Sequence, residues 1–199
     1  MKLKIGIFGE TSGKIRDALR RRGFDAVSVD FNKSKTPGPH IRGNFLDVMN
    51  WGCWSGGIFH PTCTYLCSSG LHWNKRVPGR QALTEKALDD VRAIRACNIP
   101  KWAIENPIGC ISSQICKPDQ IIQPYQFGHP ESKATCLWLK GLPLLKATNI
   151  LPPPISGRWE NQTASGQNKL GPSPDRWDIR SATYQGIAEA IAEQWGALL

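Results

Sequence analysis

The sequence predicts one α/β domain of the Rossmann type, with a mostly parallel sheet and flanking helices. Three observations lead to this prediction. An apolar segment, a glycine turn, a basic amphipathic helix and a second apolar segment fit within residues 2–30, the size of a strand–helix–strand unit. Apolar segments and helical periods continue to alternate further along the chain. The length of 199 residues suits a single domain, 1–199, with its own core.

The N-terminal unit is the clearest part of the pattern. A strand from Lys2 to Phe8 stops at a glycine, and a helix from Lys14 to Arg22 follows with Gly23 as its stop signal. A second strand from Ala26 to Val29 then ends at Asp30. Two strands joined through a helix in this way are expected to be parallel neighbours.

The later elements are predicted from apolar runs and periods. They are a short strand at 44–48, a strand at 57–59, a helix at 81–97, strands at 102–104 and 136–139, and a helix at 185–198. Two irregular insertions, at about 108–134 and 146–178, are rich in proline, glycine and polar residues. Neither insertion predicts a second core, so we expect no large target-recognition domain.

Composition narrows the class of protein. The net charge of +9 suggests an anionic partner such as a nucleic acid or a nucleotide. Seven cysteines and the absence of a signal-like N-terminal segment favour a reduced, cytoplasmic protein. No apolar run approaches the roughly 20 residues that cross a bilayer, so no membrane partner is expected.

Polar side chains follow three of the predicted strands. Asp30, Cys63 and Glu105 each stand just after an apolar segment, and ligands of open parallel sheets bind outside the carboxyl ends of the strands. The loop from Gly9 to Gly13 lets the backbone approach a ligand, and Asp30 could accept hydrogen bonds from a ribose diol. These features indicate a nucleoside-containing cofactor.

Three motifs, in the same order, resemble the C5-cytosine methyltransferases, in the compact form often encoded by phages and prophages. Residues 8–13, Phe-Gly-Glu-Thr-Ser-Gly, are similar to the family's first-strand motif. Pro61-Thr62-Cys63 is similar to its Pro-Pro-Cys loop, and Glu105-Asn106-Pro107 to its Glu-Asn-Val tripeptide. Stretches at 60–67, 123–128, 133–139 and 180–181 also resemble compact relatives, so the likeness spans nearly the whole chain. The chain departs from the family at Glu10, where a glycine is usual, and at Thr62, which replaces the second proline.

The resemblance implies an S-adenosylmethionine-dependent methyltransferase fold and methyl transfer to C5 of cytosine in DNA. Cys63 is then the nucleophile that adds to C6, and Glu105 is the acid at N3. Arg180, or else Arg176, is suggested as the arginine that contacts cytosine O2. The implied cofactor-binding residues are Phe8, Gly9, Glu10, Ser12, Gly13, Asp30, Asp47 and Pro61. The expected substrate-binding residues are His60, Thr64, Asn106, Lys133 and Arg176.

The nucleophile role requires Cys63 to have a pKa below its ordinary value, and basic surroundings and backbone amides are the groups expected to supply it. Paired cysteine knuckles are missing from the sequence, so no metal is expected. Four aromatic residues outside the predicted strands are candidates for stacking on an extruded or single-stranded base: Trp73, Tyr125, Trp159 and Trp177.

Three functions remain open at this point. The first is methylation of cytosine in DNA. The second is the same chemistry on a free deoxycytidine nucleotide, which the missing recognition domain favours. The third is a catalytically inactive module that binds nucleic acid or a nucleotide in phage–host interaction, which the altered loop at Glu10 favours.

Overall fold

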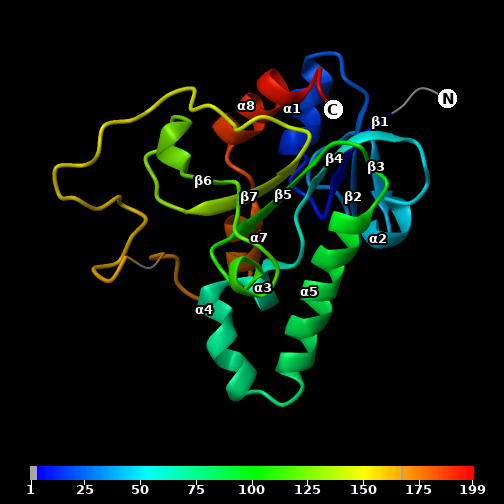
Figure 1. Cartoon of the computed structure of the whole chain (residues 1–199). Coiled ribbons are helices and arrows are strands. Elements are labelled where there is room, and N and C mark those ends of the chain that lie inside the picture. Colours follow the sequence, from blue (N-terminus) through cyan, green and yellow to red (C-terminus); the bar gives the residue numbers. More distant parts are fainter. Residues whose placement is uncertain (1–3, 167) are drawn as a thin grey trace.

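The computed structural model describes residues 4–166 and 168–199, and within these ranges seven strands form one sheet in the order β3-β2-β1-β4-β5-β7-β6. The strands are β1 (Lys4–Phe8), β2 (Ala26–Asp30), β3 (His40–Arg42), β4 (Trp54–Phe59), β5 (Trp102–Pro107), β6 (Gln120–Ile122) and β7 (Thr135–Lys140). The pairs from β3 to β5 are parallel, whereas β7 is antiparallel to both β5 and β6 (Figure 1). The mostly parallel Rossmann-like sheet predicted from the sequence is confirmed.

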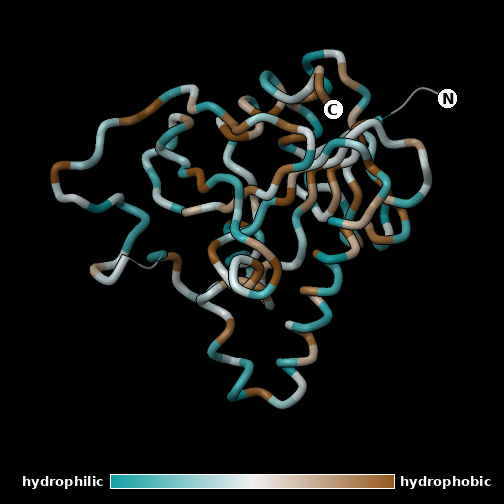
Figure 2. The backbone as a smooth tube through the Cα atoms, in the orientation of Figure 1, coloured by the Kyte–Doolittle hydropathy of each residue, from teal (hydrophilic) through white to brown (hydrophobic). Residues whose placement is uncertain are grey.

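Helices cover both faces of the sheet. The first face carries α1 (Lys14–Arg21) and α8 (Gln185–Trp195), whose buried side chains pack against Ile5 and Ile7 of β1. The second face carries α5 (Arg80–Ala96) with three short helices, α2 (Phe45–Val48), α3 (Cys63–Leu66) and α6 (Ile111–Gln114). Figure 2 shows hydrophobic residues along the strands between these layers, and also in parts of the helices and of the outer loop.

The strand order reverses at β1, because β2 lies on one side of it and β4 on the other. Such a reversal opens a crevice at the carboxyl ends of the two central strands. Here the chain turns at Gly9, which has a φ of 79°. A Cβ at Gly9 would lie 2.4 Å from the carbonyl oxygen of His60, just beyond β4, so only glycine fits between the two strand ends.

The predicted strand at 44–48 is wrong. Residues Phe45–Val48 form the short helix α2, because the Asn44 side chain accepts a hydrogen bond from the backbone N–H of Leu46 at 3.1 Å and caps the helix. The third strand of the sheet is His40–Arg42 instead, which pairs with β2. The helix at 81–97 and the strands at 57–59, 102–104 and 136–139 are confirmed, each within a longer or slightly shifted element.

The chain between α3 and α5 forms a projection that the sequence did not predict. Helix α4 (Ser68–Leu71) and the 3-10 helix η1 (His72–Lys75) lead away from the sheet, and α5 returns toward it, so the two arms form a helical hairpin (Figure 1). The hairpin is anchored at its base, where Ser68 N–H donates to the carbonyl of Ile108 at 2.9 Å.

The two predicted insertions differ from each other. Segment 108–134 is less irregular than expected, because it contains α6, strand β6 and the 3-10 helix η2 (Pro124–Gln126). Segment 141–175 carries no helix or strand in the part that the structure describes, and Figure 1 shows it looping away from the sheet. It leads into α7 (Arg176–Ser181), which returns the chain to the carboxyl edge.

Candidate active site

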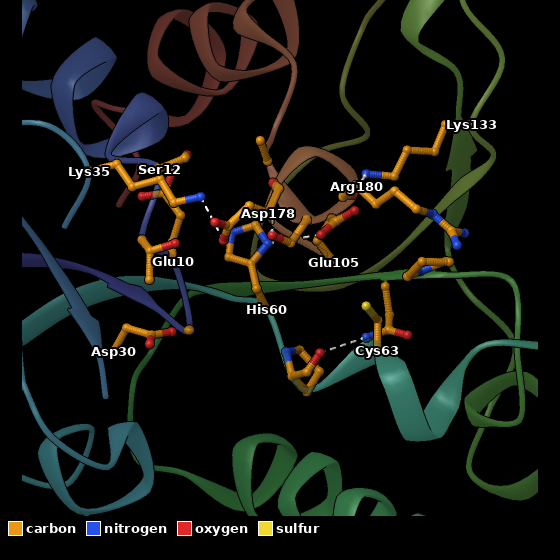
Figure 3. A pocket seen from close by; sticks show the side chains of 17 residues that line it. Glu10, Ser12, Asp30, Lys35, His60, Cys63, Glu105, Lys133, Asp178 and Arg180 are labelled. Atoms are coloured by element: carbon orange, nitrogen blue, oxygen red, sulfur yellow. Dashed lines mark hydrogen bonds and ion pairs between the residues drawn. The ribbon is translucent and has the colours of Figure 1, made fainter. Parts of the chain in front are cut away.

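A single cavity at the carboxyl edge of the sheet collects residues from β1, β2, β4 and β5. Eleven residues singled out in the sequence line it: Gly9, Glu10, Ser12, Asp30, His60, Pro61, Cys63, Glu105, Asn106, Lys133 and Arg180. Figure 3 labels eight of them among the side chains that line this cavity: Glu10, Ser12, Asp30, His60, Cys63, Glu105, Lys133 and Arg180. The cavity therefore lies at the crevice where the strand order reverses.

His60 and Glu105 form an ion pair across the ends of β4 and β5. His60 Nδ1 lies 2.9 Å from Glu105 Oε2, and both side chains are largely buried. Burial alone lowers the pKa of His60, but the hydrogen bond and charge of Glu105, with the charge of Glu10, raise it above the ordinary value. Burial alone raises the pKa of Glu105, but His60 and then Lys133 hold it below the ordinary value. Both shifts favour the imidazolium and carboxylate forms, so the two side chains form an ion pair over the pH range between their two pKa values.

Asn106 ties the same two strand ends together. Its side-chain amide donates to the carbonyl of Pro61 at 2.9 Å, which fixes the turn that precedes Cys63. Its other polar atom, Oδ1, is buried without a hydrogen-bond partner among the described residues. The turn is held rigidly while one acceptor remains free for a ligand.

Cys63 is the first residue of the short helix α3, and not part of a loop as the sequence suggested. Burial, followed by the neighbouring Cys67 and Glu105, raises the pKa of the Cys63 thiol to about 11, although Lys133 and Arg180 act in the opposite direction. The expectation of a depressed pKa is therefore wrong for the protein without ligands. Desolvation outweighs the two cations because a thiolate loses more solvation than they restore.

Glu10 is held at the N-terminus of α1. Its Oε1 accepts from the Ser12 hydroxyl at 2.5 Å and from the backbone N–H of Ile15 at 3.4 Å. Its other oxygen, Oε2, is buried without a hydrogen-bond partner among the described residues. Glu10 thus places a carboxylate at the N-terminus of α1, which is the positive end of the helix dipole.

Helix α7 covers part of the cavity and is fastened from two sides. Asp178 forms an ion pair with Lys35 at 2.7 Å, and the carbonyl of Arg180 accepts from Lys133 Nζ at 2.7 Å (Figure 3). Ser181 and Ala182 at the end of α7 also line the cavity. The cavity is therefore closed on this side by contacts that are separate from the sheet.

Five residues expected at the site do not line the cavity. Phe8 is fully buried and stacks on Phe59 with ring centroids 4.5 Å apart, so it belongs to the core. Gly13 has a φ of 74° and serves the entry into α1, where a Cβ would meet Thr36. Asp47 is an exposed residue of α2, outside the cavity because the predicted strand is a helix. Thr64 uses its carbonyl to accept from Arg80 at 2.8 Å. Arg176 begins α7, outside the cavity lining.

Sequence reasoning missed several residues of the cavity. They are Thr11, Lys35, Pro107, Asp178, Ser181 and Ala182. Thr11 and Pro107 are neighbours of predicted residues and could have been found from them. Lys35 and Asp178 lie far apart in the sequence, in segments without periodicity, and no local signal predicts their ion pair.

The predicted stacking residues are not gathered at the cavity. Tyr125 and Trp159 stack on each other with ring centroids 5.2 Å apart and an interplanar angle of 10°. Trp73 is exposed on the projecting hairpin, with the Arg76 guanidinium 5.8 Å from its ring. The side chain of Trp177 lies outside the described residues.

No group of three or more histidine, cysteine, aspartate or glutamate side chains among the described residues is arranged to hold a metal ion. No described helix is both long and apolar enough to cross a membrane.

No protein-family model matches the sequence, and no curated protein matches it. Solved structures do match. A Dnmt2 methyltransferase of S. pombe aligns with 15% identity and a TM-score of 0.48, over 70% of this chain and 49% of that one. A protein from E. coli, described as a DNA modification methyltransferase encoded within a prophage, aligns with 13% identity and a TM-score of 0.48, over 78% of this chain and 54% of that one. The chain spans about half the length of each.

Proposed function

We propose that the chain transfers a methyl group from S-adenosylmethionine to C5 of cytosine in DNA, through a covalent adduct of Cys63. The observation that carries this proposal is the meeting of Cys63 and Glu105 in one cavity with the loop after β1 and with Asp30. A thiol nucleophile and an acid are the two groups that activation of a pyrimidine at C5 needs. The neighbouring loop and carboxylate suit a nucleoside-containing cofactor.

The residues present fit S-adenosylmethionine. Asp30 lines the cavity at the end of β2, where a carboxylate can accept from a ribose diol. Among the described residues, the buried atoms Glu10 Oε2 and His60 Nε2 have no hydrogen-bond partner. Buried polar atoms in folded proteins are normally satisfied, so these positions are suited to a polar ligand with its own donors and acceptors.

In the proposed reaction the Cys63 sulfur forms a bond to C6 of the base, and the electron pair of the C5–C6 double bond moves toward C5. The His60–Glu105 pair supplies a proton at N3, which removes the negative charge that the addition creates. C5 accepts the methyl group that S-adenosylmethionine, when bound, would supply, and the electron pair of the broken S–C bond stays on the sulfur of the S-adenosylhomocysteine product. A base then takes the C5 proton, the C–H electron pair restores the double bond, and Cys63 leaves as the thiolate. N3 returns its proton to the His60–Glu105 pair.

Lys133 and Arg180 have a defined electrostatic part in this proposal. Both cations lower the pKa of Cys63 against the effect of burial. Lys133 is anchored through the carbonyl of Arg180, so the two are held together near the thiol. Their positive charge favours the thiolate form that attacks the base.

A polymer substrate is favoured by the hairpin that follows Cys63. Residues 59–83 contain no aspartate or glutamate, and the hairpin exposes Lys75, Arg76 and Trp73. A basic, aromatic projection is typical of surfaces that follow a phosphate backbone and stack on bases. Its place beside helix α3 puts this surface on the same edge as the thiol (Figure 1).

A free deoxycytidine nucleotide is the second candidate. The observation that favours it is the wall that α7 and the Lys35–Asp178 ion pair form along one side of the cavity. A small nucleotide needs less open space beside a bound cofactor than a DNA strand does. The two candidates therefore differ in polymer dependence.

The decisive experiment is transfer of labelled methyl from S-adenosylmethionine to duplex DNA, single-stranded DNA, dCMP and dCTP. We expect label in DNA, lost completely with Cys63→Ala and retained with Cys67→Ala, the matched control four residues later. Label only in nucleotides selects the second candidate. No label in any substrate overturns both and leaves a catalytically inactive binding module.

The covalent step has its own test. Fluorine at C5 cannot leave as a proton, so DNA that contains 5-fluorocytosine should trap the adduct after methylation. We expect a denaturation-resistant complex by mass spectrometry with the wild type and with Cys67→Ala, but not with Cys63→Ala. Methylation without a trapped complex would contradict the covalent route.

A further inference from the structure

Three residues that line the cavity each have a buried polar atom without a hydrogen-bond partner among the described residues: Glu10 Oε2, His60 Nε2 and Asn106 Oδ1. The first two lie next to each other in the sheet, Glu10 just after β1 and His60 just after β4. Each side chain is fixed through its other polar atom, as described for Glu10 Oε1 and His60 Nδ1. The free atoms are therefore presented at defined positions and not averaged over rotamers.

The two strand ends are in direct contact, and both side chains line the same cavity. The turn at Gly9 touches the carbonyl of His60, and the His60 N–H donates to the carbonyl of Phe8 at 2.8 Å. The charge of Glu10 acts on the His60 ring. Even so, the two free atoms do not bond to each other, so a ligand that bridges them satisfies both.

The charges around His60 indicate which ligand groups fit between Glu10 Oε2 and His60 Nε2. Glu105 and Glu10 both favour the protonated ring, and Lys133 opposes it. A protonated ring donates from both nitrogens, so Nε2 is a donor, while Glu10 Oε2 is an acceptor. Glu10 also occupies the N-terminus of α1, where it repels a phosphate that would otherwise bind there.

An acceptor carboxylate beside a donor imidazolium is complementary to the zwitterion of an α-amino acid. We propose that Glu10 binds the ammonium and His60 the carboxylate at the amino-acid end of S-adenosylmethionine. This inference rests on the proposed function, and it assigns a binding purpose to the residue that departs from the glycine of the resembled family. Charge-assisted hydrogen bonds in a buried site are the strong kind, so both residues should determine which adenosyl compounds bind.

The test is calorimetric binding of three probes that carry different parts of this end, each compared between wild type and variants so that the sulfonium charge of the decarboxylated compound cancels. S-adenosylhomocysteine has both charged groups, decarboxylated S-adenosylmethionine keeps the ammonium alone, and 5′-methylthioadenosine has neither. We expect the wild type to bind S-adenosylhomocysteine about ten- to hundredfold more tightly than 5′-methylthioadenosine, as loss of charge-assisted bonds implies.

Two conservative variants separate the contacts. Glu10→Gln keeps the acceptor toward Ser12, and should weaken S-adenosylhomocysteine and the decarboxylated compound about tenfold while leaving 5′-methylthioadenosine within about twofold. His60→Gln should weaken S-adenosylhomocysteine but not the decarboxylated compound. Asp89→Asn removes one negative charge from the exposed side of α5 and is the control for net charge. Thermal melts verify that each variant is folded.

The outcomes separate this inference from the proposed function. If adenosyl compounds bind but neither variant changes the preference among them, the zwitterion site is wrong and the methyltransferase proposal stands. If Asp89→Asn changes the preference as much as Glu10→Gln does, the effect is one of general charge and the site is also wrong. If no adenosyl compound binds the wild type, both proposals fall.

Discussion

Arg16 in α1 and Glu10 just before it are both buried and charged, but they differ in how fully their polar atoms are hydrogen-bonded. Arg16 is fully buried, and its guanidinium donates to Ser28 at 3.1 Å, Ser34 at 2.9 Å and Thr36 at 2.7 Å, with Asp17 at 2.7 Å from Nε. Glu10 is equally enclosed but leaves one oxygen unpartnered. A fully satisfied buried charge is a structural anchor, whereas an unsatisfied one in a cavity is available to a ligand.

The comparison extends to the rest of the basic helix. Arg21 pairs with Glu189, Arg22 with Glu189 and Glu193, and Arg20 with Asp25. The arginines of α1 are thus engaged within the protein and are not a free surface for phosphates. The excess positive charge that remains beside the cavity lies on the hairpin after Cys63 and on Lys133 and Arg180.

The largest expected effect is on the anchor. Arg16→Ala leaves Asp17 and several buried acceptors without their donor, so it should lower the free energy of unfolding by about 3–5 kcal/mol and the melting temperature by about 10 °C. Arg20→Ala, which breaks an exposed pair, should change stability by less than about 1 kcal/mol. Calorimetric unfolding of both variants is the measurement. If Arg16→Ala and Arg20→Ala lowered the free energy of unfolding equally, Arg16 would not be a structural anchor.

The next effect is on the reactivity of Cys63. Because its pKa is raised to about 11 from an ordinary 9.0, its thiolate fraction at neutral pH should be about a hundredfold below that of an unperturbed thiol. Iodoacetamide labelling, followed at Cys63 by mass spectrometry, should be correspondingly slow and should accelerate up to about pH 11. Glu105→Gln removes a negative neighbour and should speed the labelling. An inflection below pH 9 in the wild type would contradict this account of the thiol.

A smaller effect is expected for the stability of the His60–Glu105 pair. Because the pKa of His60 is raised above its ordinary value of 6.5, the protonated ring stabilises the folded protein below pH 6.5. This stabilisation is lost as the pH rises through the pKa of His60 in the folded protein. Because the pKa of Glu105 is lowered below its ordinary value of 4.5, its carboxylate stabilises the folded protein above pH 4.5. This stabilisation is lost as the pH falls through the pKa of Glu105 in the folded protein. Glu105→Gln should therefore lower the free energy of unfolding most between these two values, by about 2 kcal/mol, because the pair is largely but not fully buried.

Melting curves of wild type and Glu105→Gln from pH 3 to 9 measure this window. Glu189→Gln, in an exposed pair on α8, is the matched control and should show a difference of less than about 1 kcal/mol. A cost of Glu105→Gln that does not depend on pH would mean that His60 and Glu105 do not form an ion pair.

The smallest effect is expected at Glu10. Glu10→Gln keeps the oxygen that accepts from Ser12 and Ile15, and the atom it replaces has no partner, so stability should change by less than about 1 kcal/mol. Chemical unfolding measures this. A loss as large as that of Arg16→Ala would make Glu10 a second anchor and would remove it from the ligand site.

Much of the fold follows from local pattern. The helix at Arg80–Ala96 and the strands β1, β2 and β5 were predictable, because a 3.6-residue period or a short apolar run between turn residues depends only on neighbours in the chain. The strand expected at 44–48 failed because the capping side chain of Asn44 overrides a short apolar run. The hairpin at 68–79 escaped prediction because its short helices have no apolar period.

For the candidate site, local sequence indicated which residues follow strands but not what state they are in. Cys63, Glu105 and Glu10 were found from motifs and strand ends, since parallel strands bring their carboxyl ends to one edge. Three features of the site arise between residues that are distant in sequence. They are the Glu105–His60 ion pair, the Lys35–Asp178 ion pair and the raised pKa of Cys63. Burial and charge at a point in space are sums over such neighbours, which no local pattern contains.

The sequence by itself determined the α/β class, the order of the main elements and the candidate nucleophile and acid, because periodicity and turn residues act over a few positions. Only the tertiary structure decided that the polar atoms of Arg16 are hydrogen-bonded whereas one oxygen of Glu10 is not, among the described residues. It also decided that Phe8 and Asp47 lie outside the cavity and that α7 lines one side of it. The physical reason is that desolvation and hydrogen bonding of a buried group depend on every segment that packs around it, and those segments meet only when the chain has folded.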